Sequence, residues 1–256
     1  MKRLPLPQTP IIDLGDWLQQ PAGAYISAWE QTQFAGSTAD IFGFHALQIG
    51  LPQLPALTAS RMPHQWISVS SMPATGSQLK ISLVHDFAEL PFDSQSIDLV
   101  ILPHVLEFAA EPHQILREVE RVLIPEGRVI ITGLNRTSLW GLRQFFGKRT
   151  GHPFLPEEGE FISPHRLKDW LKLLSMEVEE TRYGCYALPV DSAQWLQNSG
   201  VMEGLGRRWW PRLGAVYMLE AVKRVRGMHL VGPALKRKRL RRAHAVPVAN
   251  KGGQIE

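Results

Sequence analysis

The feature that most constrains the fold of this chain is an alternation of short apolar runs with helical segments between residues 40 and 226. Strands that alternate with helices are typical of a parallel sheet covered by helices. We therefore predict an α/β fold with a seven-stranded, doubly wound, mostly parallel sheet. The seven strand-like runs are FHALQIG, QWISVSS, LKISLVH, IDLVILP, RVIITGL, EVEETRYGCYAL and VYMLEAVKRV.

Two segments have the apolar spacing of amphipathic helices, and both are expected to connect strands. EPHQILREVERVL (111–123) has Pro112 in its first turn, and SPHRLKDWLKLL (163–174) has Ser163 as its N-cap. A further helical segment is expected at 17–34, and 191–212 is a long connection before the last strand. Because long connections in compact domains are usually functional or mobile, these two segments are candidates for a substrate cap.

Composition divides the chain into three parts. Residues 1–39 are read as an N-terminal helical extension or cap, residues 40–232 as the α/β domain, and residues 233–256 as a basic, disordered tail. The run KRKRLRR (236–242) supplies six of the 28 basic residues, so the rest of the chain has 22 basic against 24 acidic residues. The formal net charge of +4 therefore belongs to the tail, which is a solvated end or a contact for RNA or a membrane surface.

The N-terminus and the cysteine content favour a cytoplasmic protein. The start MKRLPLPQTPIIDLGD has prolines and an early aspartate where a signal peptide has an apolar core. No apolar run approaches the roughly 20 residues that a membrane span requires. The single cysteine, Cys185, excludes an internal disulfide and suggests a reducing compartment.

Ligands of open parallel α/β sheets bind beyond the carboxyl ends of the strands. The residues that follow the predicted strands are therefore the candidate site. They are Gly50, Ser70, Ser71, Asp86, Phe87, Pro103, His104, Asn135 and Arg136.

The stretch from 81 to 135 resembles the class I S-adenosylmethionine-dependent methyltransferases, especially their small-molecule type. The resemblance rests on the aspartate after the third strand, the LPF that follows it, SIDLV, EPHQILREVERVLIPEGRVII and LN, in the family's order and spacing. With FGFHALQIG and GLNRTSLWGLR, the whole chain also resembles a group of small uncharacterised bacterial members. The resemblance implies a last strand antiparallel to the others, S-adenosylmethionine as cofactor and S-adenosylhomocysteine as product.

Carried over to this chain, the resemblance assigns cofactor contacts to the strand ends. Asp86 accepts a hydrogen bond from the adenine amino group beside the backbone of Phe87, and Pro103 and His104 lie near the methionine part. His104 is also the candidate catalytic base, because its unperturbed pKa lies close to neutrality. Each of these two residues also has a structural alternative to its functional role. Asp86 could hold a turn, and His104 could be an interior histidine.

Two motifs depart from the family pattern. After the first strand only Gly50 remains of several glycines, followed by Leu51, Pro52, Gln53, Leu54 and Pro55. A side chain at Leu51 and the missing N–H groups of two prolines remove cofactor contacts, although one lost hydrogen bond costs only about 1 kcal/mol. After the second strand, Ser70 replaces the expected acidic residue.

The sequence leaves two functions open. The first is a methyltransferase with an unknown acceptor, either a small molecule or RNA-borne. The alternative is a catalytically inactive methyltransferase fold that binds RNA or a protein, with Arg207, Arg208, Arg212 and the basic tail as the contact surface for an anionic partner. Asn135-Arg136 is expected to form a turn, and no metal site is expected because the nine histidines lack metal-binding spacing.

Overall fold

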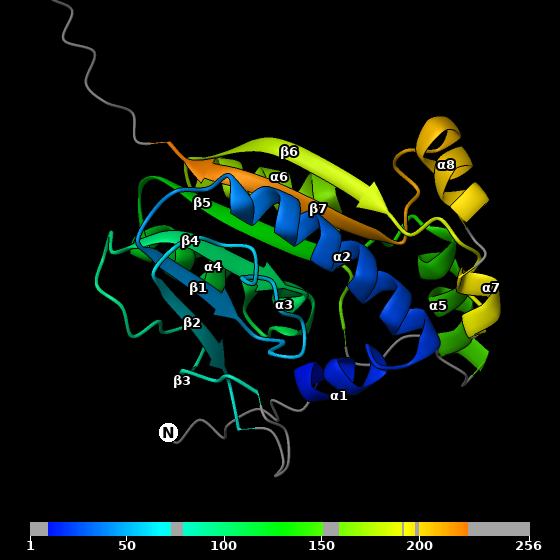
Figure 1. Ribbon diagram of the computed structural model, residues 1–256, viewed down its shortest axis with the longest axis horizontal. Helices are drawn as coiled ribbons and strands as arrows, with labels where there is room; N and C mark the ends of the chain where they lie inside the picture. The colour runs from blue at the N-terminus through cyan, green and yellow to red at the C-terminus, as the bar shows by residue number, and fades with distance from the viewer. Residues whose placement is uncertain (1–9, 73–78, 151–158, 191, 198–199, 225–256) are drawn as a thin grey trace, which may run out of the picture. The chain divides into compact units, whose positions relative to one another are not determined.

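Within the described residues, one sheet of seven strands has the order β3-β2-β1-β4-β5-β7-β6 (Figure 1). The computed structural model describes residues 10–72, 79–150, 159–190, 192–197 and 200–224. β7 runs antiparallel to both of its neighbours, so the predicted sheet and its reversed last strand are confirmed. The strands are β1 (His45–Ile49), β2 (His64–Val69), β3 (Leu83–Val84), β4 (Ile97–Pro103), β5 (Leu123–Leu134), β6 (Met176–Gly184) and β7 (Val216–Lys223).

The central strands β1 and β4 are buried along almost their whole length, as apolar runs in a parallel sheet require. Their register pairs Gln48 with Ile101, and the register of β1 with β2 pairs Ile49 with Ser68. The carboxyl ends of β1, β2 and β4 therefore meet at one edge of the sheet. This edge is the place where the sequence predicts a ligand.

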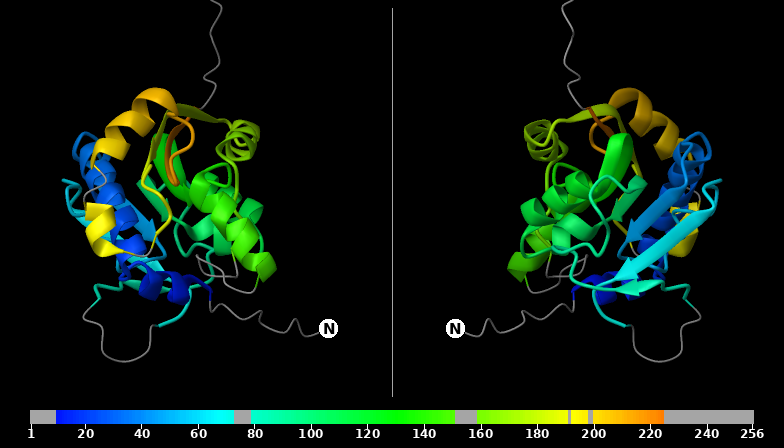
Figure 2. Two further views of the ribbon diagram at one scale, coloured as in Figure 1. Left: turned by 90° about the vertical axis from the view of Figure 1, so that its right-hand side faces the viewer. Right: turned by 90° about the vertical axis from the view of Figure 1, so that its left-hand side faces the viewer.

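Helices cover both faces of the sheet (Figure 2). α1 (Pro10–Trp17) and α2 (Pro21–Ala39) share one apolar core with Leu99 and Ile101 of β4. α4 (Pro112–Val122) and α6 (Pro164–Leu173) pack on the other face, against Val100 and Leu102. Both crossover helices were predicted, and Ser163 caps α6 by accepting a hydrogen bond from the Arg166 amide.

The N-terminal segment differs from the prediction at its boundaries. The helix expected at 17–34 is α2, which begins at Pro21 and ends at Ala39, and the preceding helix α1, Pro10–Trp17, was not predicted. A proline inside a helix removes a hydrogen bond and clashes with the preceding turn, whereas it is favourable in the first turn. α1 and α2 pack into the same core as the sheet.

Four further helices follow the carboxyl ends of strands. α3 (Val105–Phe108) comes directly after β4, near the middle of Figure 1, whereas α5 (Leu139–Thr150), α7 (Ala193–Gln197) and α8 (Gly200–Trp209) lie on its right. α5 is tied to the segment after β6 by the Trp140 indole, which donates to the Ala187 carbonyl at 2.7 Å. α8 is tied to the same segment by Glu203, which accepts from the Tyr186 amide at 2.8 Å.

The described residues belong to one compact unit, Met1–Val225. The predicted tail 233–256 lies outside the described residues. In the part of the chain that the structure describes, no helix is long and apolar enough to cross a bilayer.

Candidate functional site

Gly50, which follows β1, is the meeting point of three strand-end segments. Its φ is +75°, a left-handed conformation that favours glycine. A Cβ at this position would lie 2.9 Å from Val105 Cγ2 and 3.8 Å from the Phe87 ring. Gly50 thus allows the segments after β3 and β4 to approach the end of β1.

The loop after β1 is held by a buried amide side chain. Gln48 Nε2 donates to the carbonyls of Gly50, Leu51 and Leu54, and its Oε1 accepts from the Ala56 amide at 3.2 Å. Leu51 also has a left-handed φ, +41°, and its side chain is buried in the core shared with α1 and α2. The loop therefore keeps two consecutive left-handed residues where the related family has glycines, at a cost of about 1–2 kcal/mol for the leucine.

The loop after β1 also contains no regular secondary structure. Between Gly50 and Pro63 the described chain forms turns and no helix. The prolines at 52, 55 and 63 interrupt any longer helical run. The crossover from β1 to β2 is consequently a loop that packs against α1. The contact is close, because a Cβ on Gly15 of α1 would clash with the side-chain amide of Gln53.

The residues after β2 and β3 are more open. Ser70 is half-buried, Asp86 is exposed and Phe87 is buried. Asp86 Oδ1 accepts a hydrogen bond from the Ala88 amide at 3.0 Å, so the aspartate holds the turn that leaves β3. The adjacent positions of β1, β2 and β3 in the sheet place Gly50, Ser70 and Asp86 along one edge.

His104, at the end of β4, lies in the interior between two carboxyl groups. Its side chain is 1% exposed, with Nε2 2.9 Å from Glu30 Oε1 of α2 and Nδ1 2.9 Å from Glu107 Oε2 of α3. The other oxygen of Glu107 accepts from the Leu134 amide at 2.6 Å. His104 has a left-handed φ of +53°, and its amide donates to the Thr132 carbonyl. This cluster of Glu30, His104 and Glu107 connects α2 to the carboxyl edge of the sheet.

The charges of this cluster differ from those expected of free side chains. Burial opposes the charged imidazole, but the carboxylates of Glu30 and Glu107 outweigh it and raise the pKa of His104 to about 10. Burial raises the pKa of Glu107, and the imidazolium partly offsets this. His104 is therefore a cation at neutral pH, with both ring nitrogens directed at carboxyl groups. It is not placed to accept a proton from an acceptor molecule.

Four buried polar atoms in or near this cluster have no hydrogen-bond partner among the described residues. His104 Nε2 and Glu30 Oε1 have only their ion pair with each other, and Glu30 Oε2 and Thr132 Oγ1 have neither a hydrogen bond nor an ion pair. Thr132 is paired with Pro103 in the register of β4 and β5, so it too lies at the end of β4. Buried polar groups normally have partners, and those without one mark sites where water or a ligand binds. In the described ranges no group of His, Cys, Asp and Glu side chains is arranged to hold a metal ion.

The sequence did not single out Glu30, Gln48 or Glu107. A signal for Glu30 exists, because Ile26, Glu30 and Phe34 share a four-residue spacing that puts the glutamate in the apolar stripe of α2. Glu107 lies three residues after His104, on the first turn of α3. A glutamate within the apolar stripe of a helix predicts that its carboxylate is buried and contacts another polar side chain.

The remaining predicted residues have distinct surroundings. Asn135 is buried and forms the expected turn: its side chain donates to the carbonyls of Arg212 and Gly214 and accepts from the Thr137 amide. Arg207 and Arg208 are exposed on α8, and Arg212 is exposed in the loop that follows. Arg207 and Arg208 belong to α8, whereas the backbone of Arg212 contacts Asn135 at the end of β5.

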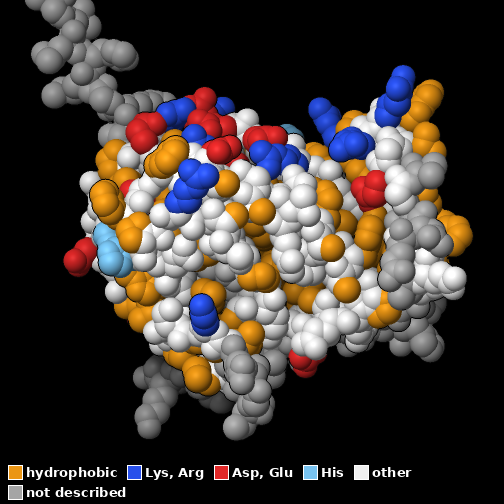
Figure 3. All heavy atoms as spheres, viewed as in Figure 1, with side chains coloured by type: hydrophobic (Ala, Val, Ile, Leu, Met, Phe, Trp, Pro, Cys, Tyr) orange, Lys and Arg blue, Asp and Glu red, His pale blue; other side chains and the backbone are white. Residues whose placement is uncertain are grey.

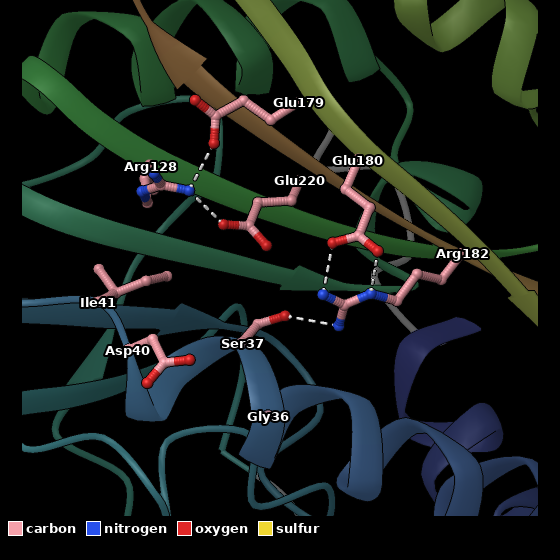
Figure 4. A pocket seen from close by; sticks show the side chains of 9 residues that line it. All are labelled: Gly36, Ser37, Asp40, Ile41, Arg128, Glu179, Glu180, Arg182 and Glu220. Atoms are coloured by element: carbon pink, nitrogen blue, oxygen red, sulfur yellow. Dashed lines mark hydrogen bonds and ion pairs between the residues drawn. The ribbon is translucent and has the colours of Figure 1, made fainter.

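A surface cavity of about 330 Å³ lies against the C-terminal half of α2 and the strands β5, β6 and β7 (Figure 4). Most of its charged side chains pair with one another: Arg128 contacts Glu179 and Glu220, and Arg182 contacts Glu180 and donates to Ser37 Oγ. Asp40 also lines the cavity and takes part in none of these pairs (Figure 4). This internal pairing leaves the cavity with no evident ligand. Ile41 lies just before β1 begins, so the cavity is at the opposite end of the strands from Gly50.

The strand order and the reversed β7 together define the fold class of this protein. The chain belongs to the class I S-adenosylmethionine-dependent methyltransferase superfamily. A family model described as a methyltransferase domain matches residues 56–131, a range that begins after the altered loop at Gly50.

A curated relative gives the particular family. The chain is 31% identical over 229 residues to the uncharacterized protein YafS of Escherichia coli strain K12, covering 88% of this chain and 86% of the relative, and the two belong to one family.

Solved structures support the fold. The protein bound to the Haloferax volcanii Trm112 methyltransferase activator is 17% identical, with a TM-score of 0.56, over 86% of this chain and 100% of its own. An S-adenosylmethionine-dependent methyltransferase of Archaeoglobus fulgidus is 16% identical, with a TM-score of 0.55, over 77% of this chain and 93% of its own.

Proposed function

We propose that this protein is an S-adenosylmethionine-dependent methyltransferase that binds its cofactor along the edge from Asp86 to His104. The observation that carries the proposal is the order of β3, β2, β1 and β4, which lines up Asp86, Ser70, Gly50 and His104 at one edge. Bound there, S-adenosylmethionine supplies an activated methyl group on a sulfonium centre. The protein then supplies mainly orientation and the exclusion of water.

The residues after β2 and β3 fit the nucleoside part of the cofactor. The Asp86 carboxylate is exposed, and one of its oxygens is fixed by the Ala88 amide, so the group is oriented before a ligand arrives. We assign the adenine amino group to Asp86, the ring to Phe87 and a ribose hydroxyl to Ser70. A serine there lacks the charge-assisted bond of a carboxylate, which favours weaker binding than the family usually has.

The residues around β1 and β4 fit the methionine part by their charge. Glu30, His104 and Glu107 together hold two carboxyl groups against one imidazolium, and Glu30 Oε2 has no hydrogen-bond partner among the described residues. A cationic group nearby, such as an ammonium or a sulfonium, would balance this carboxylate. We assign His104 the role of a positioning residue that orients Glu30, and we assign Gly50 and Pro103 backbone contacts.

His104 is not needed as a general base in this proposal. A sulfonium methyl group is activated by the donor itself, so a nucleophilic acceptor requires little help from an acid or a base. The acceptor remains a small or RNA-borne molecule that approaches beneath α5, α7 and α8. The cap elements, rather than the strand ends, would then determine acceptor specificity.

Calorimetric titration of the purified, ligand-free chain with S-adenosylmethionine and S-adenosylhomocysteine tests the proposal. Micromolar binding is expected, and Asp86→Asn should weaken it about ten- to a hundredfold because it removes a charged acceptor but keeps the oxygen that holds the turn. Glu89→Gln, on an exposed residue of the same turn, is the matched control and should bind normally.

The outcomes separate the two parts of the proposal. Normal binding by Asp86→Asn would show that the assigned edge is wrong. A folded wild-type chain that binds neither compound at millimolar concentration would refute the cofactor itself. That result would favour the inactive binding module.

A further inference from the structure

The helices over the carboxyl edge carry an exposed apolar surface. Eleven of the sixteen large apolar side chains that are exposed among the described residues lie on α5, α7, α8 or the loops next to them. We call this the cap surface: the exposed side chains of 139–149, 188–190, 195 and 205–213. Exposed apolar side chains that gather on neighbouring elements, unlike scattered single ones, often mark interaction sites.

The surface follows from the way α5 and α8 pack. On α5 the exposed Leu139, Leu142 and Phe146 recur at helical spacing, while Trp140 and Gln144 of the same helix are buried. On α8 the inward side is fixed by Gly206, where a Cβ would meet the Tyr186 ring. Two helices thus present apolar residues outward although each has a second, buried side.

Basic side chains are interspersed with these apolar residues, as the right-hand end of Figure 3 shows. Arg143, Arg149, Arg207, Arg208 and Arg212 are exposed on the cap surface. The three helices contain a single acidic residue, which is Glu203 of α8. Glu203 is half-buried, and its carboxylate accepts hydrogen bonds from the Tyr25 hydroxyl and the Tyr186 amide, so the one described carboxylate of these helices is already hydrogen-bonded.

We infer that the cap surface binds the surface of a membrane that contains anionic phospholipids. Aromatic and aliphatic side chains beside arginines are the composition of protein surfaces that lie in the headgroup region of a bilayer. Each basic residue near anionic lipids adds attraction, and the five exposed arginines outnumber the single described carboxylate of these helices.

The aliphatic side chains favour lipid over RNA. Surfaces that bind single-stranded RNA rely on aromatic rings that stack on bases. Six of the eleven apolar residues of the cap surface are leucine or valine, which cannot stack but can insert between acyl chains. The left view of Figure 2 shows α5, α7 and α8 on the side of the sheet that faces the viewer, so one partner surface can approach all three helices.

Co-sedimentation of the full chain with vesicles tests the inference. Vesicles of phosphatidylglycerol and phosphatidylcholine in equal parts should bind the protein, and pure phosphatidylcholine should bind it much less. The variant Trp209→Ser/Trp210→Ser changes two side chains that are 67% and 59% exposed and should lower the partition coefficient at least about tenfold. Leu142→Ser/Phe145→Ser, on α5, is an independent variant with the same expectation.

Two controls separate the cap surface from other contributions. Leu173→Ser, on an 83% exposed leucine of α6 outside the cap surface, should bind like the wild type. A chain with the six basic residues of 236–242 changed to glutamine should bind more weakly at low salt but remain sensitive to the tryptophan change. Circular dichroism at each step establishes that the variants are folded.

Three results would overturn the inference. Binding that depends on the basic run at 236–242 but not on either cap variant would show that the cap surface does not contact lipid. Competition by single-stranded RNA, with RNA binding lost in the same variants, would make RNA the ligand. A dimer of the wild type that becomes monomeric in Trp209→Ser/Trp210→Ser would make a second copy of this chain the occupant.

Discussion

Raising the pH should destabilise this protein through His104. In the folded state its pKa is about 10, against an ordinary value of 6.5, so between these values the folded chain binds a proton that the unfolded chain has lost. The stabilisation is fully present below about pH 6.5 and is lost as the pH rises through 10. One pKa unit corresponds to about 1.4 kcal/mol, so about 3 kcal/mol of the unfolding free energy should be lost by pH 9.

Other buried groups do not reverse this sign. Burial raises the pKa of Glu107, so that group adds a loss in the same direction, beginning near its ordinary value of 4.5. Burial also raises the pKa values of Cys185 and Tyr217, whose ordinary values are 9.0 and 10.0, and their effect begins above pH 9. The interval from pH 6.5 to 9 therefore isolates His104 from the thiol and the phenol.

Replacing His104 by glutamine should remove this pH dependence. The variant leaves Glu30 and Glu107 buried without their cation, which costs about 3–5 kcal/mol at pH 7. Glu30→Gln combined with His104→Gln should cost less than the sum of the two single changes, since the two side chains are in contact.

Urea unfolding followed by circular dichroism at pH 6, 7, 8 and 9 measures these differences. His165→Gln, on α6, is the matched control because its ring is 89% exposed, and it should follow the wild-type profile. Parallel pH profiles for the wild type and His104→Gln would refute the reasoning.

Three further changes have defined expectations. Gly50→Ala should lower the unfolding free energy by about 2 kcal/mol in urea titrations, because a Cβ would lie 2.9 Å from Val105 in a left-handed residue; a loss under about 0.5 kcal/mol would contradict this. Ser163→Ala should cost about 1 kcal/mol in the same assay, and an unchanged midpoint would mean that the N-cap contributes nothing. Glu30→Gln should weaken S-adenosylmethionine about tenfold in calorimetry; a smaller loss for S-adenosylhomocysteine would assign Glu30 to the sulfonium, equal losses would assign it to the ammonium that both compounds carry, and unchanged binding of both would argue against charge complementarity.

The central elements of the fold could be predicted closely from the sequence. IDLVILP coincides with β4, Ile97–Pro103, because a strand buried on both faces needs a continuous apolar run. EPHQILREVERVL contains α4, Pro112–Val122, because its apolar residues keep one helical spacing. Both patterns are local, so neither depends on which segment packs against them.

Edges and caps were harder to predict. LKISLVH suggests a strand of seven residues, but at the sheet edge only Leu83 and Val84 pair with β2. α5 was not predicted, since its buried side is made by Trp140, Gln144 and two glycines instead of a plain apolar stripe. Both segments depend on contacts with distant parts of the chain, β3 on its pairing with β2 and α5 on its hydrogen bond to Ala187, which local sequence patterns do not reveal.

The candidate site likewise contains residues that local sequence patterns predict and residues that depend on distant contacts. Gly50, Asp86 and His104 could be found because they follow strands, and the ends of parallel strands share an edge. The partner of His104 could not, because Glu30 lies 74 residues earlier in the chain. Only the packing of α2 on the sheet brings the carboxylate to the imidazole.

The position of β7 between β5 and β6 has a consequence for biosynthesis. β6 pairs with β7 alone in the sheet, so after its synthesis it has no partner until residues up to 223 have left the ribosome. During that interval the nascent chain exposes one edge of β5 and both edges of β6, the kind of surface through which strands of different molecules associate. Premature termination anywhere between Gly184 and Val216 would make this exposure permanent, so such fragments should be prominent substrates of chaperones and proteases.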